Sequence, residues 1–381
     1  MAAPAFIVIG NAENRRVTLF QDALARQGLP PATVVPWREL LAEPSRLTDL
    51  PDTDALVRID AAGESWAVEK ALLKRGHAAA TTLGCAVLPP ERVEALEEDR
   101  GRIVCPRQAH LGFLDVLAQL EACFAARPRW RVLQQPRSIA DLFDKRVTSR
   151  LYASRGIPVP EPLDGVTDVE SLRARMREED WREVFVKVSC GSSASCLGLF
   201  RSHRGREWLL TSIEQADTGW YNSLQVRRIV EPGRVEEVLG FLLREGSQVE
   251  RAIPKARLGG DPFDCRVLMV AGEPAFIVVR QSTLPITNLH LGGKRGDLEA
   301  LRAAVPPNEW EQAMESCRRV ARLHDCLHVG IDLLFEEYFQ GHRIVEANAF
   351  GDLLPNLSRD GLSVYEWEIR EALSRYGAAP G

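Results

Sequence analysis

The first third of the chain alternates short apolar runs with amphipathic stretches of helical spacing. Residues 5–9 and 55–59 are apolar runs of strand length, and residues 14–27 have the pattern of a helix that ends at Gly28. We also expect a short strand at 34–35 and helices at 37–41, 64–74 and 107–127. Strands that alternate with helices predict a parallel sheet covered by helices. The pattern therefore predicts an α/β domain over residues 1–137, in which 128–136 is a connection.

A different pattern begins near residue 138 and predicts a second unit. Residues 141–155 and 171–179 have helical spacing, and residues 184–188 form an apolar strand that runs into a loop of small residues. From about residue 248 the pattern is mostly antiparallel β, with strands expected at 249–253, 263–270 and 274–280 and a long helix at 309–324. We divide this part of the chain into two subdomains, 138–246 and 247–381.

Two apolar strands near the C-terminal end carry acidic groups. Residues 329–335 and 343–352 are strand-like and are joined by a polar break of hairpin length. Glu346 and Asn348 are two residues apart and so share a face of a strand, and pairing about the middle of the break places Asp332 opposite Glu346. Burial of an unpaired charge costs free energy, so carboxylates grouped in apolar strands are expected to have a partner of opposite charge. Three oxygen-bearing side chains predict a site for Mg²⁺, with Mn²⁺ as an alternative.

The use of lysine is unusual in this chain. Of 48 basic residues only six are lysine, at positions 70, 74, 145, 187, 255 and 294. Lysine is needed where a compact ammonium fits and a planar guanidinium does not. Lys187 lies in an apolar strand just before Gly191, Ser192 and Ser193, whose small side chains would let backbone N–H groups approach a phosphate. Taken alone, a flexible turn beside a lysine with a solvated head explains this segment equally well.

Bulk composition argues against other classes of protein. The chain has 381 residues and a net charge of −5, which gives no sign of a nucleic-acid partner. No apolar run reaches the length of a membrane span, so no membrane partner is expected. The eight cysteines form no Cys-x-x-Cys pair, and we expect free thiols in a reducing cytoplasm.

The motifs taken in order resemble the ATP-grasp superfamily. They are Asp144-Lys145, Gly156-Ile157-Pro158-Val159-Pro160, Phe185-Val186-Lys187, Val249-Glu250, Asp264-Cys265-Arg266, Arg280, Asn288-Leu289-His290-Leu291-Gly292-Gly293, Gly330-Ile331-Asp332 and Val345-Glu346-Ala347-Asn348. The chain is similar in particular to carboxylate–amine ligases of the ribosomal-protein or peptide glutamate-ligase type, over roughly residues 138–365. The resemblance implies an α/β (α+β) protein, with a Rossmann-like pre-ATP-grasp domain followed by an ATP-grasp fold of two α+β subdomains.

The resemblance also implies a role for each matching residue. The residues expected to contact ATP are Lys145, Lys187, Gly191, Ser192, Ser193 and Glu250. The residues expected to hold magnesium are Asp332, Glu346 and Asn348. The residues expected to face the γ-phosphate and the activated substrate are Arg266, Arg280 and Asn288. After the hinge strand, where many relatives place an acidic residue for the ribose, this chain has Lys255, which would instead reach a phosphate or an acidic substrate.

The implied activity is an ATP- and Mg²⁺-dependent, ADP-forming ligation of a carboxylate to an amine through an acyl phosphate. The substrates would be small molecules, such as amino acids, or peptides. Such chemistry depends on positioning and charge neutralisation, which agrees with the lack of an evident nucleophilic triad. Two alternatives stay open, namely an ATP-grasp phosphotransferase and a non-catalytic nucleotide-binding module. Because relatives commonly self-associate, a homo-oligomer is compatible with the resemblance.

Overall fold

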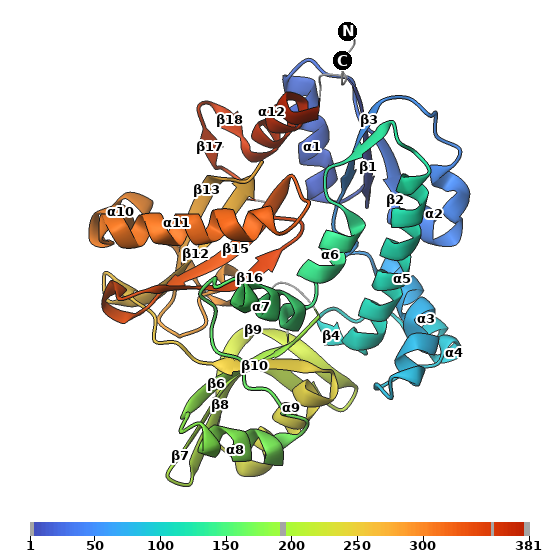
Figure 1. The fold of residues 1–381 in the computed structure, drawn as a ribbon. Coiled ribbons are helices and arrows are strands. Elements are labelled where there is room, and N and C mark those ends of the chain that lie inside the picture. The colour runs from blue at the N-terminus through green and yellow to red at the C-terminus, as the bar shows by residue number, and fades with distance from the viewer. Residues whose placement is uncertain (1–3, 191–195, 352–353, 377–381) are drawn as a thin grey trace.

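Three larger sheets and one two-stranded sheet organise residues 4–190, 196–351 and 354–376, which are the residues that the computed structural model describes. Figure 1 shows the first sheet at the upper right, the third at the left and the second at the bottom of the view. Helices lie against the three larger sheets, so the mixed α/β class expected from the sequence is confirmed.

The first sheet is parallel and has the strand order β2-β1-β3-β5. Its strands are β1 (Ala5–Gly10), β2 (Thr33–Pro36), β3 (Ala55–Ile59) and β5 (Trp130–Val132). The accompanying helices are α1 (Arg15–Arg26), α2 (Trp37–Ala42), η1 (Pro44–Leu47), α3 (Trp66–Thr82), α4 (Pro90–Glu94) and α5 (Pro106–Ala125). The predicted parallel sheet with helices is therefore confirmed.

Strand β5 corrects one prediction, because residues 128–136 were expected to be only a connection. Trp130 and Val132 are buried and pair with Ala55 and Val57 of β3, whereas Arg131 between them is exposed. A strand of three residues is too short to show an alternating pattern by itself.

The second sheet is antiparallel and has the order β10-β6-β7-β8-β9-β4. Its strands are β4 (Arg102–Ile103), β6 (Glu183–Val188), β7 (Leu197–His203), β8 (Arg206–Ala216), β9 (Gly219–Ile229) and β10 (Ser247–Arg251). Helices α8 (Val169–Glu178) and α9 (Pro232–Arg244) pack on this sheet through a shared apolar cluster.

The third sheet is also antiparallel and has the order β14-β13-β12-β15-β16, with β11 beside β12. Its strands are β11 (Arg257–Leu258), β12 (Asp261–Val270), β13 (Glu273–Gln281), β14 (Lys294–Arg295), β15 (His328–Phe335) and β16 (His342–Asn348). The remaining elements of this part are η2 (Leu289–Leu291), α10 (Leu298–Ala304), α11 (Pro307–Arg322), η3 (Glu337–Phe339), β17 (Ser358–Arg359), β18 (Leu362–Ser363) and α12 (Val364–Tyr376).

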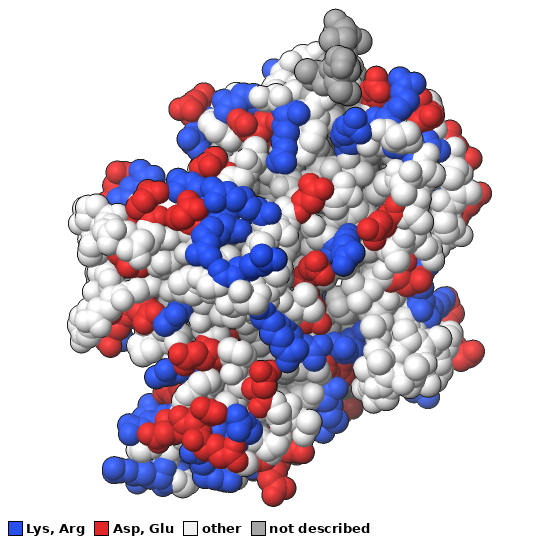
Figure 2. Space-filling model, in the orientation of Figure 1, with Lys and Arg blue, Asp and Glu red and all other residues white. Residues whose placement is uncertain are grey.

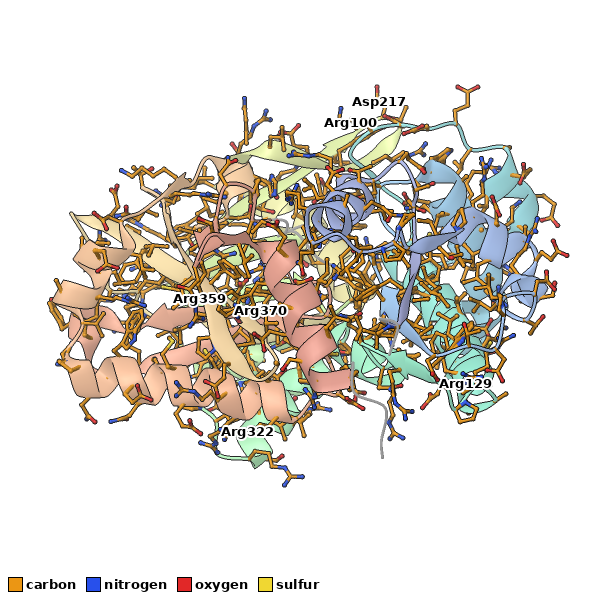
Figure 3. All side chains as sticks on the ribbon, turned by 90° about the horizontal axis from the view of Figure 1, so that it is seen from above. Arg100, Arg129, Asp217, Arg322, Arg359 and Arg370 are labelled. Carbon is orange, nitrogen blue, oxygen red and sulfur yellow. The ribbon has the colours of Figure 1, made fainter. Side chains whose placement is uncertain are left out.

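Two strands of the second sheet come from outside residues 138–246. Strand β10 follows residue 246, and β4 comes from the N-terminal part and pairs with Trp220 and Tyr221 of β9. In Figure 3, Arg100 just before β4 and Asp217 in the β8–β9 turn are labelled at the same edge of the molecule. The three sheets otherwise follow the division made from the sequence, and the domain bounds themselves stay a prediction.

The helix expected at 141–155 is interrupted, which corrects a second prediction. Helix α6 (Pro136–Leu142) ends before Asp144, and α7 (Lys145–Ser154) begins directly after it. Asp144 has extended φ and ψ of −113° and 103°, and its carboxylate accepts the Arg146 N–H at 3.0 Å. An aspartate that caps a helix N-terminus thus starts a new helix inside an otherwise helical pattern.

A buried ionic group fastens the first sheet to α12. Arg58 of β3 is only 1% exposed, and its Nη1 donates to Glu368 Oε2 at 2.6 Å while its Nε donates to Asp60 Oδ2 at 3.3 Å. The guanidinium also lies 4.9 Å from the centre of the Phe20 ring. These contacts join segments more than 300 residues apart in the chain, so the N-terminal domain is held against the C-terminal helix.

Basic and acidic side chains share the face of the molecule shown in Figure 2. Basic side chains gather there over α11, and acidic ones lie around them. On α11, Arg318 contacts Glu273 and Glu311 at 2.8 Å each, so its charge is largely balanced. Among the described residues, no helix combines the length and apolar character needed to cross a membrane.

The Arg58 group predicts a large difference between two arginine variants. Arg58→Ala would leave the Glu368 carboxylate buried without its guanidinium and should lower the free energy of unfolding by about 3–5 kcal/mol in urea denaturation. The control is Arg129→Ala, since Arg129 forms an exposed ion pair with Asp54 at 3.1 Å (Figure 3) and its loss should change stability little. Equal losses in the two variants would contradict this account of Arg58.

Candidate active site

A pocket between the second and third sheets collects most of the residues that the sequence singled out. Its lining includes Lys145, Lys187, Glu250, Arg266, Arg280, Asn288, Asp332 and Glu346. Asn348 lies next to this group and donates from Nδ2 to Glu346 Oε1 at 3.3 Å. Gly191, Ser192 and Ser193 lie outside the described residues, so their predicted place in a phosphate loop stays a prediction.

One face of the third sheet carries a row of charges across three strands. Arg266 of β12 pairs with Asp332 of β15, and Asp332 pairs with Glu346 of β16. Directly opposite residues of an antiparallel pair share a face and lie close together. The predicted placement of Asp332 opposite Glu346 is therefore confirmed. A bulge follows directly, because the register shifts after Asp332, and Glu346 and Val345 both line the pocket.

Asp332, Glu346 and Asn348 form an oxygen-rich corner that suits a hard cation. Two carboxylates and one amide oxygen, completed by phosphate oxygens, are the donors that Mg²⁺ prefers. Within the described ranges no group of three His, Cys, Asp or Glu residues could hold a metal ion, and the metal role of Asp332, Glu346 and Asn348 stays a prediction. Burial would raise the pKa of Glu346, but Lys145, Lys187 and Arg266 lower it to about 2, so the carboxylate stays ionised.

Lys187 and Glu250 form a buried ion pair on the facing sheet. Lys187 of β6 lies opposite Gln248 of β10, and Glu250 is two residues further along the same face. The Lys187 ammonium donates to Glu250 Oε1, and Gln248 Nε2 donates to Glu250 Oε2 at 2.8 Å. Burial would lower the pKa of Lys187, but the carboxylates of Glu250 and Glu346 hold it above its ordinary value. Lys187 is therefore a fixed positive charge aimed into the pocket.

The start of helix α7 brings the second lysine to the same place. The backbone N–H of Lys145 donates to the carbonyl of Ser189 at 2.9 Å, just beyond the end of β6. The Lys145 ammonium lies 3.8 Å from Glu346 Oε2 on the third sheet. The Asp144 cap thus sets Lys145 between the two sheets. This position depends on residues distant in sequence, so the local sequence could not predict it.

A second charged group in the pocket is centred on Asp264 and was not predicted as a site. Arg280 of β13 pairs with Asp264 in register and donates from Nε to Oδ1 at 2.6 Å. Lys255 donates to Asp264 Oδ2 at 3.0 Å and to Thr287 Oγ1 at 2.7 Å. Burial would raise the pKa of Asp264, but Arg280 and Lys255 hold it well below its ordinary value. A signal was present, because Asp264 is two residues from Arg266 and so shares its face.

Asn288 also lines the pocket, but its side chain has a structural partner. Its Oδ1 accepts the backbone N–H of His290 at 2.8 Å and so caps the η2 turn. The predicted role of Asn288 beside the substrate stays a prediction, as do the individual roles of the other pocket residues.

Comparisons with known proteins give a likeness in structure but not in sequence. No protein-family model matches the sequence. No curated protein matches it at a significant level. Among solved structures, the chain is similar to the ATP-grasp ligase PsnB complexed with a phosphomimetic variant of a minimal precursor, Mg and ADP. The two are 13% identical with a TM-score of 0.52, over 98% of this chain and 99% of that chain.

Two further solved structures match over nearly the full length. The macrocyclase MdnC, bound with precursor peptide MdnA from Microcystis aeruginosa MRC, is 11% identical with a TM-score of 0.53, over 98% of this chain and 100% of that chain. The D-alanine–D-alanine ligase from Bacillus anthracis, complexed with ATP, is 11% identical with a TM-score of 0.50, over 99% of this chain and 97% of that chain. At these identities the likeness establishes the fold, and the chain has the ATP-grasp fold.

The buried position of Lys187 predicts how its removal would affect a nucleotide. Lys187→Met should weaken ATP binding in calorimetry about 10- to 100-fold, which is the loss of one charge-assisted hydrogen bond. Because Glu250 would then be buried without its partner, the double variant Lys187→Met/Glu250→Gln keeps the local charge balanced and should show the same loss. Lys294→Met, at an exposed ion pair of the third sheet, is the control. If both Lys187 variants bind ATP with unchanged affinity, Lys187 does not contact the phosphates.

Proposed function

We propose that this protein is an ATP-dependent, ADP-forming ligase that joins a carboxylate to an amine through an acyl phosphate. The observation that carries the proposal is the meeting of two lysines, two arginines and an oxygen-rich corner in one pocket. The ATP-grasp fold supports it, since the solved structures of similar fold include proteins described as ligases with ADP or ATP bound.

The first step would be phosphoryl transfer to the substrate carboxylate. A carboxylate oxygen attacks the γ-phosphorus, the bond to the bridging oxygen breaks, and ADP leaves. Lys145 and Lys187, which both line the pocket, would neutralise the phosphates. Asp332, Glu346 and Asn348 would hold Mg²⁺, which supplies further neutralisation of the β- and γ-phosphates when bound. Positioning and charge account for most of the catalysis of such a transfer.

The second step would be attack of an amine on the acyl phosphate. The amine nitrogen bonds to the acyl carbon, phosphate leaves with the electrons of the C–O bond, and the nitrogen loses a proton. Arg266 and Arg280 lie on the sheet face beside Asp332 and would stabilise the charge that develops on the transferred phosphoryl group and the acyl oxygen. Both arginines are more than four-fifths buried, so their positions are set before the substrate arrives.

The carboxylate and the amine would belong to peptides or amino acids. Two of the proteins similar to this chain, PsnB and MdnC, have structures described as complexes with precursor peptides. A third is a ligase named for joining two D-alanine molecules. A peptide or an amino acid is therefore the substrate class to test first.

A substrate screen tests the ligase proposal directly. The full-length protein with MgATP should release ADP only when a carboxylate and an amine are both present, and the product should be an amide detected by mass spectrometry. Free amino acids and short peptides, offered singly and in pairs, form the screen. Release of ADP with a single non-amine acceptor would favour the phosphotransferase alternative. ATP binding in calorimetry without turnover across the screen would favour a non-catalytic module.

Glu346 offers a sharper test of the metal corner. Glu346→Ala should lower MgATP turnover about 100-fold or more, because loss of a metal ligand removes several kcal/mol of charge stabilisation. Circular dichroism should show the same fold, since Glu346 lies at the pocket rather than in the apolar core. Glu337→Gln, on the exposed turn of the same hairpin, is the control and should keep full turnover. Normal turnover in Glu346→Ala would refute the metal assignment.

A further inference from the structure

Asp264 is the centre of a buried group of hydrogen bonds that none of the proposed steps uses. Its Oδ1 accepts Arg280 Nε at 2.6 Å, and its Oδ2 accepts both Lys255 Nζ at 3.0 Å and the hydroxyl of Thr287. Asp264 is 7% exposed and Thr287 is 2% exposed, so water screens these contacts weakly. The three donors come from β13, from the segment after β10 and from the loop after β13.

The Thr287 hydroxyl is a donor and an acceptor at the same time. It donates to Asp264 Oδ2, and its Oγ1 accepts Lys255 Nζ at 2.7 Å. A hydroxyl has one proton to donate and lone pairs that accept, so the two roles are compatible. Because Lys255 also donates to Asp264 Oδ2, the ammonium, the hydroxyl and the carboxylate form a closed ring of three hydrogen bonds. Each member of the ring thus helps to fix the other two.

Asp264 and Asp332 together orient the guanidinium of Arg280. Arg280 pairs with Asp264 in strand register, and its Nη2 lies 3.2 Å from Asp332 Oδ1. The guanidinium is planar, so contacts from Nε and Nη2 to two separate carboxylates fix the direction of its plane. The contact to Asp332 alone would constrain that plane less. The position of Asp264 therefore decides where Arg280 points in the pocket.

Thr287 lies in a loop that contacts both sheets of the pocket. Ile286 is 5% exposed and packs against apolar residues of β7 and β8 in the second sheet. The next residue, Thr287, reaches Asp264 of the third sheet through its hydroxyl. Residues 285–288 all line the pocket. The loop is therefore held on both sides, and the Thr287 hydroxyl is its polar contact to the third sheet.

We infer that Thr287 is a positioning residue for Arg280. Together with Lys255, its hydroxyl holds Asp264 in the place from which the carboxylate orients the guanidinium. Thr287 acts through Asp264 and not by contact with the substrate. This inference rests on the proposed function, because it takes Arg280 to stabilise charge on the reacting groups.

Removal of the hydroxyl should disturb the whole group. In Thr287→Val, Lys255 loses an acceptor and Asp264 loses a donor in a buried place, so the remaining partners must rearrange. Turnover should fall about 10- to 100-fold, since a misplacement of about 1 Å at a reacting group can cost about 100-fold in rate. ATP affinity should change little, because Lys145 and Lys187 keep their positions. Thr287→Ser keeps the hydroxyl and should restore turnover.

The Arg280 Nε–H reports its own position without any substrate. Because this proton is buried and donated to Asp264, it should exchange slowly with water in ¹⁵N-resolved NMR of the full-length protein. Arg280→Lys identifies the signal by its loss. We expect faster exchange in Thr287→Val and Thr287→Ala, and exchange like that of the wild type in Thr287→Ser. Unchanged exchange in both variants without the hydroxyl would overturn the inference.

Kinetics with MgATP tests the consequence for catalysis. Release of ADP is measured with the carboxylate and amine pair that gives the highest turnover in the substrate screen. We expect a lower kcat and an unchanged KM for ATP in Thr287→Val and Thr287→Ala, which marks an interaction that matters in the transition state.

Ser316→Ala is the matched control. Ser316 of α11 is another buried hydroxyl, 2.8 Å from His342 Nε2. Its loss should lower the midpoint of thermal unfolding but leave kcat and the Arg280 signal unchanged. An equal loss of turnover in Ser316→Ala and Thr287→Val would assign the effect to general destabilisation and overturn the positioning role.

Failure of this inference is distinguishable from failure of the proposed function. If the wild type forms an amide and Thr287→Val does so at the same rate, the positioning role is wrong and the ligase stands. If the wild type releases no ADP with any pair in the screen, the proposed function fails. The positioning role depends on that function and is then refuted with it, whatever the Arg280 signal shows.

Discussion

Burial of charge on a sheet face is the constraint on which the rest of this site depends. Of the ten charged side chains that line the pocket among the described residues, nine are less than one-fifth exposed, namely Lys145, Lys187, Glu250, Lys255, Asp264, Arg266, Arg280, Asp332 and Glu346. Each would be strongly destabilising alone, so every one needs a partner of opposite charge. Strand register supplies many of these partners, since opposite residues of antiparallel strands share a face. The strand register that defines the fold therefore also determines which charged groups of the site are paired.

This arrangement also explains how a ligand could bind without new charge having to be buried. Phosphates and a divalent cation would exchange partners with groups that are already paired, rather than enter an apolar cavity. Among the described residues, the six cations of the pocket outnumber its four carboxylates, which suits an anionic ligand. Because the dielectric constant of the pocket is low, each of these electrostatic interactions is strong. The exchanges are also coupled, because a group that pairs with the ligand gives up its earlier partner.

Local pattern and register explain which parts of the site could be predicted. The spacing of Glu346 and Asn348, together with the hairpin that joins them to Asp332, predicted the row of acidic groups correctly. The Asp144 cap and the short strand β5 were missed, because each is a departure of a few residues within a longer pattern. The Asp264 group was missed because its members come from a hinge segment, two strands and a loop, and no periodicity connects them.

The sequence by itself determined the order of strands and helices and the residues that share a strand face, because these depend on backbone geometry over a few residues. It also marked the two lysines, since they stand out in an arginine-rich chain. Only the tertiary structure decided which charges pair across the pocket. Lys187 meets Glu250 because β6 and β10 pair in one sheet although they are distant in sequence, and Lys145 approaches Glu346 because α7 packs beside the third sheet. The choice of partner for a buried charge depends on that packing, and no local pattern encodes it.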